Sequence, residues 1–356
     1  MPKFDPEFLE EEFHKGHRKE ERAERKLLSE KDRSKFKKSG HDKKPSEATY
    51  STLPIGIVLS ITGEKIIIDV EGKEYFCSLK GSLKKEKGIY KNLITVGDFV
   101  RLNIENEEGQ IFYVEKRKSE LTRVDKTGRK KQLIAANIEQ AFITMSVVVP
   151  PFKPNLVDRF LISAKKGNIY PIVIINKYDL LKANNSSDDE KALSNNFLKD
   201  YSKLGYLIVC VSCKTMLGID TIKELMIGKS SVFVGQSGVG KSSLINKTTE
   251  YNLKIGTVVH KTYKGAHTTT RAQLLPLKKG GFCIDTPGIK SFGLWDLKKE
   301  DVVDHFHEIK EIGNYCYYPN CTHIDEPNCA VKEACGEDKI SSLRFESYIS
   351  LMKEIL

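Results

Sequence analysis

The chain has 356 residues, of which 39% are hydrophobic, and a net charge of +10. Its length exceeds that of one ordinary domain, and its apolar content excludes a globally disordered protein. No run approaches the roughly 20 apolar residues of a membrane span, and the charged start contains no apolar signal region. We therefore expect a soluble, cytoplasmic monomer with no membrane partner. The positive charge favours a polyanionic partner, nucleic acid first. Eight clustered cysteines do not suit a secreted disulfide scaffold.

Residues 1–48 are charged and aperiodic, which predicts a disordered tail or a fraying charged helix. From Pro54 onward, short β-branched and aromatic runs alternate with Gly, Asn and charged turns, and five such strands fit an oligonucleotide/oligosaccharide-binding (OB) barrel over residues 49–118. Lysines and Tyr90 fall in the long loop before the fourth strand, an arrangement that suits RNA loops. The expected strands are 56–60, 65–70, 73–79, 98–104 and 110–114.

Residues 119–131 form a polar connector, after which strands and helices alternate up to residue 295. Such alternation predicts a mostly parallel sheet covered on both faces. The expected strands are 140–147, 171–175, 206–211, a strand from 231, 273–277 and 281–284, and the helices are 155–167, 195–204 and 219–226.

A guanine-selective loop is predicted directly after the strand at 171–175. A carboxylate at Asp179 can accept hydrogen bonds from N1–H and the 2-amino group of guanine, whereas adenine offers neither donor. Lys177 would lie along the base, and Asn176 would hold the loop together. An Asn-initiated turn is the alternative, but the phosphate loop described below favours nucleotide binding.

A second loop at Ser212, Cys213 and Lys214 ends the next strand and resembles the Ser-Ala-Lys loop that backs a guanine base. Cys210 and Cys213 also form a Cys-x-x-Cys pair, which is the pattern of redox or zinc sites. Because no second pair is nearby, we expect this loop to bind the base.

The stretch 231–244 contains a phosphate-binding loop, an apolar strand that ends at Gly235 and is followed by Gly240, Lys241 and Ser242. Glycines let backbone N–H groups turn toward phosphate oxygens, and the next helix adds the positive end of its dipole. Lys241, a predicted catalytic residue, would reach the β- and γ-phosphates, and Ser242 would bind Mg²⁺. The expected nucleotide contacts here are Gly235, Gln236, Ser237, Gly238, Val239, Gly240, Lys241, Ser242 and Ser243.

Two later segments are expected to sense the γ-phosphate. Asp285 would hold Mg²⁺ through water, and the Gly288 N–H would meet the γ-phosphate. Ile289 stands where many GTPases place a water-orienting Gln, and it cannot polarise water. A threonine among residues 268–270 can reach Mg²⁺ and the γ-phosphate, and His267 can orient or deprotonate the attacking water. We predict a catalytic role for His267.

The motif order is unusual, because the guanine loops precede the phosphate loop. The same sheet can form if the chain is circularly permuted. The permutation tethers whatever follows 285–288 directly to the γ-phosphate-sensing loop.

The second strong motif is a set of soft ligands, Cys316, Cys321, His323 and Cys329, within 14 residues. Three thiolates and an imidazole match a closed tetrahedral zinc site. The segment has little core of its own, so the metal would supply much of its folding energy. Free thiols or disulfides are the alternatives, and Cys335 is a substitute ligand with poorer spacing. Helical patterns flank the site at 302–312 and 340–356.

Together these residues resemble one family, the circularly permuted GTPases that depend on the small ribosomal subunit, RsgA/YjeQ. The match covers about residues 50–335 and includes the motifs at 134–138, 155–159 and 265–270, the permuted order and the zinc spacing.

The resemblance implies GTP hydrolysis stimulated by the small ribosomal subunit during its late maturation. It also implies that His267 assists hydrolysis and that Thr269 contacts magnesium. Ala266 departs from the polar or basic residue common in the family at that position. The long charged tail is not a general family feature.

We therefore predict an α/β protein in three parts: an OB barrel at 49–118, a circularly permuted P-loop GTPase domain at 119–295 and a zinc-binding helical module at 296–356. The barrel and the zinc module would contact ribosomal RNA of the small subunit, with Mg²⁺–GTP and one Zn²⁺ as cofactors. One alternative is an RNA-binding translation regulator that uses GTP as a structural ligand. The other is an ATP-dependent kinase with the same phosphate loop.

Overall fold

The computed structural model describes residues 50–63, 65–84, 90–106, 108–124, 131–182, 186–251, 272–285 and 297–355. The chain divides into a unit of residues 1–51 and a unit of residues 52–356, and every element below belongs to the second. The tail predicted at 1–48 lies outside the described residues.

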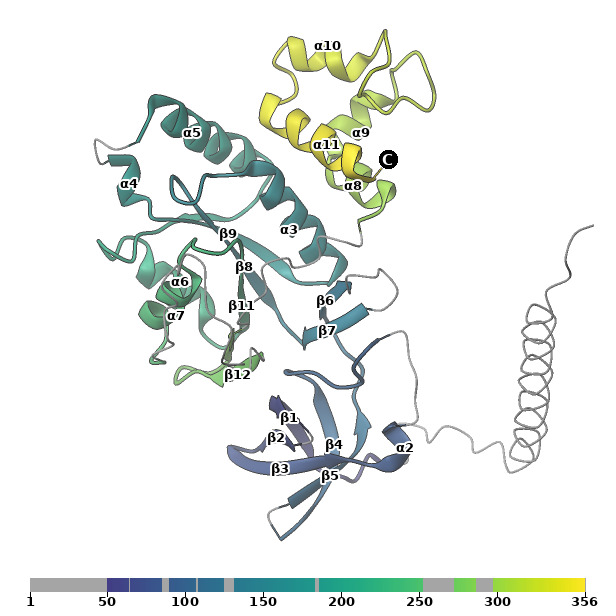
Figure 1. The fold of residues 1–356 in the computed structure, drawn as a ribbon, viewed down its shortest axis with the longest axis vertical. Coiled ribbons are helices and arrows are strands. Elements are labelled where there is room, and N and C mark those ends of the chain that lie inside the picture. Colours follow the sequence, from purple (N-terminus) through teal and green to yellow (C-terminus); the bar gives the residue numbers. More distant parts are fainter. Residues whose placement is uncertain are drawn as a thin grey trace, which may run out of the picture. The chain divides into compact units, whose positions relative to one another are not determined.

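The first five strands close into a barrel, as predicted (Figure 1). They are β1 (Ile55–Thr62), β2 (Lys65–Val70), β3 (Lys73–Leu79), β4 (Phe99–Glu105) and β5 (Glu108–Val114). Their order is β1-β2-β3-β5-β4, and β4 pairs back to β1. Alternate positions point inward, so that Val58, Ile68, Leu102 and Ile111 are fully buried. A short helix, α2 (Gly81–Lys84), which was not predicted, follows β3.

The connector predicted at 119–131 is wrong in part, because it contains a strand. β6 (Glu120–Val124) pairs antiparallel with β7 (Lys131–Ala136). Leu121 and Leu133 of this hairpin are buried, and the burial of Leu121 overrides the polar composition around it.

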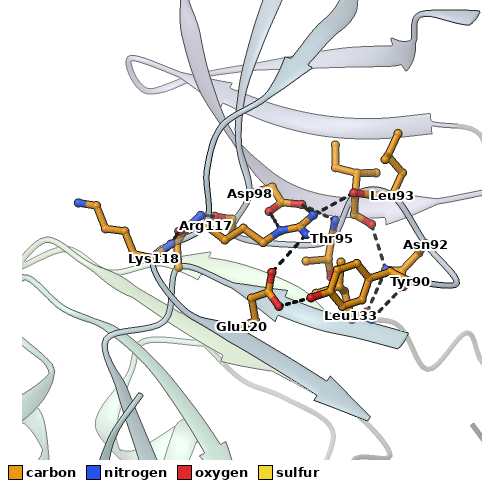
Figure 2. Close-up of polar contacts among 12 residues, drawn as sticks. Tyr90, Asn92, Leu93, Thr95, Asp98, Arg117, Lys118, Glu120 and Leu133 are labelled. Carbon is orange, nitrogen blue, oxygen red and sulfur yellow. Dashed lines mark hydrogen bonds and ion pairs between the residues drawn. The ribbon is translucent and has the colours of Figure 1, made fainter. Parts of the chain in front are cut away.

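A polar network joins the barrel to this hairpin (Figure 2). The Arg117 guanidinium donates to both carboxylate oxygens of Asp98, at 2.6 and 3.0 Å. The Tyr90 hydroxyl donates to Glu120 at 2.6 Å, and Asn92 bonds the backbone of Leu133 in both directions. The Asp98 side chain is fully buried, and this bidentate pair joins the segment before β4 to the segment before β6.

The sheet of the α/β region runs β10-β9-β8-β11-β13-β12, and β12 is its antiparallel edge. The strands are β8 (Gln140–Ser146), β9 (Tyr170–Asn176), β10 (Ile208–Cys210), β11 (Ser230–Val234), β12 (Gln273–Pro276) and β13 (Phe282–Asp285). At one residue pair, Ser60 with Gln273, barrel strand β1 continues this sheet.

Helices cover both faces of the sheet, as predicted (Figure 1). They are α3 (Pro154–Lys166), α4 (Asp179–Lys182), α5 (Asp188–Lys203), α6 (Ile219–Met226) and α7 (Lys241–Thr248). Along β8, Ala141 and Ile143 pack with α3 and α5, whereas Phe142 packs with α6 and α7 on the other face. Because strands β8, β9, β10, β11 and β13 run parallel, their carboxyl ends, where the motif loops begin, lie at one edge of the sheet.

The C-terminal helices form a separate core against α3. They are α8 (Lys299–His305), α9 (His307–Gly313), α10 (Ala330–Gly336) and α11 (Ser342–Ile355). The helix predicted at 302–312 is split at Phe306, and α10 was not predicted. Ile162 of α3 belongs to this core. None of the helices in the described ranges is both long and apolar enough to cross a bilayer.

Asp158 of α3 is the buried centre of the contact between the helices of the α/β region and the C-terminal helices. Its carboxylate accepts hydrogen bonds from Tyr201, Ser347 and Arg344. His305 Nε2 lies 2.9 Å from it. Burial raises the pKa of Asp158, but Arg344 and His305 outweigh this effect and lower the pKa overall. A charged Asp158 on α3 therefore holds four helices together, namely α3, α5, α8 and α11.

Candidate GTP and zinc sites

The phosphate loop has the backbone that its glycines permit. Gly235, Gly238 and Gly240 have φ values of +143°, +84° and +94°. A Cβ atom on Gly235 would lie 2.1 Å from the Thr144 carbonyl oxygen, so no larger residue fits there. The loop leads directly into α7, whose N-terminus is a favourable position for phosphate.

Lys241 lies inside this loop. Its Nζ donates to the carbonyl oxygens of Gly235 and Gln236, both at 2.8 Å. Burial lowers the pKa of Lys241 to about 8. The ammonium is thus held where the β- and γ-phosphates of a nucleotide would approach. Ser242 and Ser243 follow in the first turn of α7.

The predicted guanine loop is bonded to the phosphate loop. Asn176 Nδ2 donates to the Val239 carbonyl at 2.8 Å, and its Oδ1 accepts the Lys177 N–H at 2.8 Å. Lys177 adopts a φ of +59°, and its Nζ donates to the carbonyl of Gly238 at 2.8 Å. Sequence reasoning gave Asn176 the role of holding the loop, but not its partner 63 residues away.

The Asp179 carboxylate faces the second predicted loop. Ser212 Oγ donates to Asp179 Oδ1 at 2.6 Å. The same Oγ accepts the N–H groups of Lys214 and Thr215, both at 3.2 Å. One carboxylate oxygen is thereby oriented, and Asp179 Oδ2 is left to meet a base.

Both loops open on one cavity of about 190 Å³ beside the phosphate loop. It is lined by Asn176, Lys177, Asp179, Leu180, Cys213, Lys214, Gly240 and Ser243. Leu180 was not predicted, although its place directly after Asp179 could have indicated it. A larger cavity, of about 600 Å³, lies at the other end of α7 near Lys247 and holds none of the motif residues.

Several predicted site residues cannot be placed. His267, Thr269 and Gly288 lie outside the described residues, and so does the predicted loop 265–270. Asp285 ends β13, but its side chain is also outside them.

The four predicted metal ligands converge. The ligand atoms of Cys316, Cys321, His323 and Cys329 all lie within 4.8 Å of one another. The two sulfurs of Cys316 and Cys329 are 3.8 Å apart, and His323 Nδ1 lies 3.5 and 3.4 Å from them. Tetrahedral zinc with its usual bond lengths requires about 3.8 Å between two sulfurs and about 3.6 Å between sulfur and nitrogen. The ligands therefore fit Zn²⁺, and Cys335 is not among them.

Glu326 holds the loop that carries His323. Its carboxylate accepts hydrogen bonds from the N–H and hydroxyl of Thr322 and from the N–H of Ile324. These bonds fix His323 at a φ of +63°, which is uncommon for a residue with a side chain.

Comparison with known proteins decides the family. The model of the RsgA GTPase family matches residues 114–295. The chain belongs to the RsgA GTPase family. A relative from Phocaeicola vulgatus, named small ribosomal subunit biogenesis GTPase RsgA, is 35% identical over 305 residues, which are 84% of this chain and 96% of that protein. A protein of the same name from a Geobacillus strain is 36% identical over 303 residues, again 84% of this chain and 96% of the relative.

Solved structures agree with this assignment to the RsgA family. YjeQ from Thermotoga maritima aligns with a TM-score of 0.65 at 32% identity, covering 85% of this chain and 98% of that one. YloQ, described as a circularly permuted GTPase, aligns with a TM-score of 0.62 at 28% identity, covering 87% and 98%. The predicted fold, a permuted GTPase domain with a barrel before it, is confirmed.

Raising the pH above 8 is expected to weaken GTP binding through Lys241. The free protein loses the Lys241 proton near its pKa of about 8, whereas a bound triphosphate raises that pKa and retains the proton. Affinity should therefore fall by up to about tenfold per pH unit above 8. Titration calorimetry between pH 7 and 9 measures this slope. In Lys241→Arg the cation stays protonated, so its slope should be flatter; equal slopes in both proteins would contradict the assignment.

Proposed function

We propose that this protein is a GTPase that binds the small ribosomal subunit and hydrolyses GTP to GDP and phosphate during late maturation of that subunit. The observation that carries the proposal is the cavity in which Asp179 and the phosphate loop meet. Family membership supports the reaction, and the names of the relatives support the partner. The net charge of +10 suits a partner rich in RNA.

In this proposal Asp179 selects guanine, and Lys241 with the N–H groups of residues 235–243 holds the phosphates. Ser242, Thr269 and Asp285 would hold Mg²⁺, which when bound neutralises charge on the β- and γ-phosphates. His267 would orient or deprotonate the attacking water, a role for which the absence of Gln at position 289 leaves room.

We further propose that the three predicted parts, 49–118, 119–295 and 296–356, have separate tasks in a monomeric, cytoplasmic protein. The barrel contributes RNA contact. The C-terminal module, with one Zn²⁺ held by Cys316, Cys321, His323 and Cys329, follows the γ-phosphate-sensing segment in the chain. GTP would therefore favour subunit binding, and hydrolysis would favour release.

The test is steady-state GTP hydrolysis with and without purified small ribosomal subunits. We expect small subunits to raise turnover at least about tenfold, and large subunits to have no such effect.

His267→Ala should lower the stimulated rate by about 100-fold while GTP affinity is unchanged.

The two alternatives give different results in the same assays. A translation regulator that uses GTP only as a structural ligand would show no subunit-stimulated turnover. A kinase would bind ATP as tightly as GTP, because the phosphate loop alone does not distinguish the bases.

A further inference from the structure

Three tyrosines around the first zinc ligand are exposed. Tyr315, Tyr317 and Tyr318 have 82%, 73% and 43% of their surface accessible. The rings of Tyr317 and Tyr318 lie 5.0 Å apart at 83° to each other. Tyrosine is enriched at protein interfaces because its rigid ring contributes a large contact area at small entropic cost. Three such rings within four residues therefore indicate a binding surface.

The backbone that carries these rings is fixed by the ligand loops. Tyr315 N–H donates to the Ile312 carbonyl at 3.0 Å, and Cys321 N–H donates to the Tyr318 carbonyl at 3.1 Å. Tyr317 N–H donates to the carbonyl of Asn328, next to the ligand Cys329. A partner would bind a surface that is already ordered, which reduces the entropic cost of association.

The C-terminal part of the chain that carries these tyrosines is negative overall. Residues 297–355 contain twelve Asp or Glu and seven Lys or Arg, a net charge of −5, while the rest of the chain carries +15. Glu311 is exposed one helical turn before Tyr315, and Asp325 is exposed in the loop that bonds Tyr317.

Of the lysines nearest in sequence, Lys310 pairs with Asp304. Lys332 donates to the Glu326 backbone carbonyl and keeps its positive charge, which the net charge of −5 already includes. A site of three thiolates and one imidazole that holds Zn²⁺ adds one further negative charge.

We propose that this tyrosine face, defined as Tyr315, Tyr317 and Tyr318 with Glu311 and Asp325, binds a lysine- or arginine-rich segment of a protein on the small subunit. Cations lie favourably over tyrosine rings and pair with carboxylates, whereas RNA phosphates would be repelled by the same carboxylates. The inference rests on the proposed function and deepens it, because it assigns the tyrosine face of the zinc module a protein partner in place of the ribosomal RNA that the sequence predicts for this module.

Charge reversal separates the two kinds of partner. Full-length protein with a non-hydrolysable GTP analogue is titrated against purified small subunits. Glu311→Lys should weaken binding about tenfold if the partner is a basic protein, and Glu346→Lys, the same change at an exposed position on α11, should stay within about twofold. Tighter binding by Glu311→Lys would indicate phosphate as the partner and overturn the inference.

The aromatic contribution is tested in the same titration. Tyr315→Ala combined with Tyr317→Ala should weaken subunit binding at least about tenfold, with zinc content and GTP affinity unchanged. Tyr170→Ala, at a tyrosine of the GTPase domain with 57% of its surface accessible, is the matched control. Wild-type affinity in the double variant would overturn the inference.

Crosslinking identifies the partner's chemistry directly. A benzophenone side chain at position 317, irradiated in the complex, should give an adduct that protease degrades and ribonuclease leaves intact. A ribonuclease-sensitive adduct would overturn the inference while the proposed function stands. If the wild-type protein binds no small subunit at all, the proposed function itself fails, and the inference fails with it.

Discussion

Asp179→Asn is expected to weaken GTP binding by about 100-fold or more. The asparagine NH₂ would face the 2-amino group of guanine, so that two donors meet and a buried hydrogen bond is lost. Ser212 can still donate to the side-chain oxygen at position 179, so the loop should keep its shape. Fluorescence titration with a labelled GTP analogue measures the change.

Two controls make this result specific. Asp220→Asn is the same substitution at an exposed ion pair on α6 and should leave affinity unchanged. Xanthosine triphosphate carries a carbonyl in place of the 2-amino group, so its affinity should rise in Asp179→Asn while that of GTP falls. If Asp179→Asn retained wild-type GTP affinity, the carboxylate would not contact the base.

Cys329→Ser is expected to abolish zinc binding and to unfold the loops around α10. A structural zinc ion stabilises a small module by about 10 kcal/mol, whereas between the ligands Cys316 and Cys329 only Cys321 and Ile324 pack against the hydrophobic core. Metal analysis should find about one zinc per wild-type chain and none in the variant. Limited proteolysis should then cut between Cys316 and Cys329, while the GTPase domain keeps its affinity for GTP.

Cys335→Ser is the matched control for this experiment. Cys335 is a half-buried thiol on α10, outside the ligand cluster. Its replacement should leave one zinc per chain and protease resistance unchanged. Loss of zinc in Cys335→Ser and not in Cys329→Ser would reverse the ligand assignment.

The predictions from sequence failed where local composition and tertiary burial disagree. Strand β6 lies inside the predicted connector 119–131 because Leu121 stands among polar and charged residues, and only packing against the rest of the chain buries it. The single helix predicted at 302–312 is broken because Phe306 has a non-helical backbone and a fully buried ring. A regular 3.6-residue pattern in the sequence reveals neither the burial of a side chain by distant packing nor a local break in a helix.

The sequence alone determined the motifs that depend on short spacing: the glycines and lysine of 235–241, the carboxylate of Asp179 that is predicted to select guanine, and the four predicted metal ligands. Such groups act through backbone geometry and side chains within one loop, so their order along the chain is sufficient. Only the tertiary structure decided which loops share a cavity, as in the bond from Asn176 to Val239, and which buried charges meet, as at Asp158 and Arg344, 186 residues apart. The physical reason is that contacts between distant segments follow from how helices and strands pack, and no local pattern records that packing.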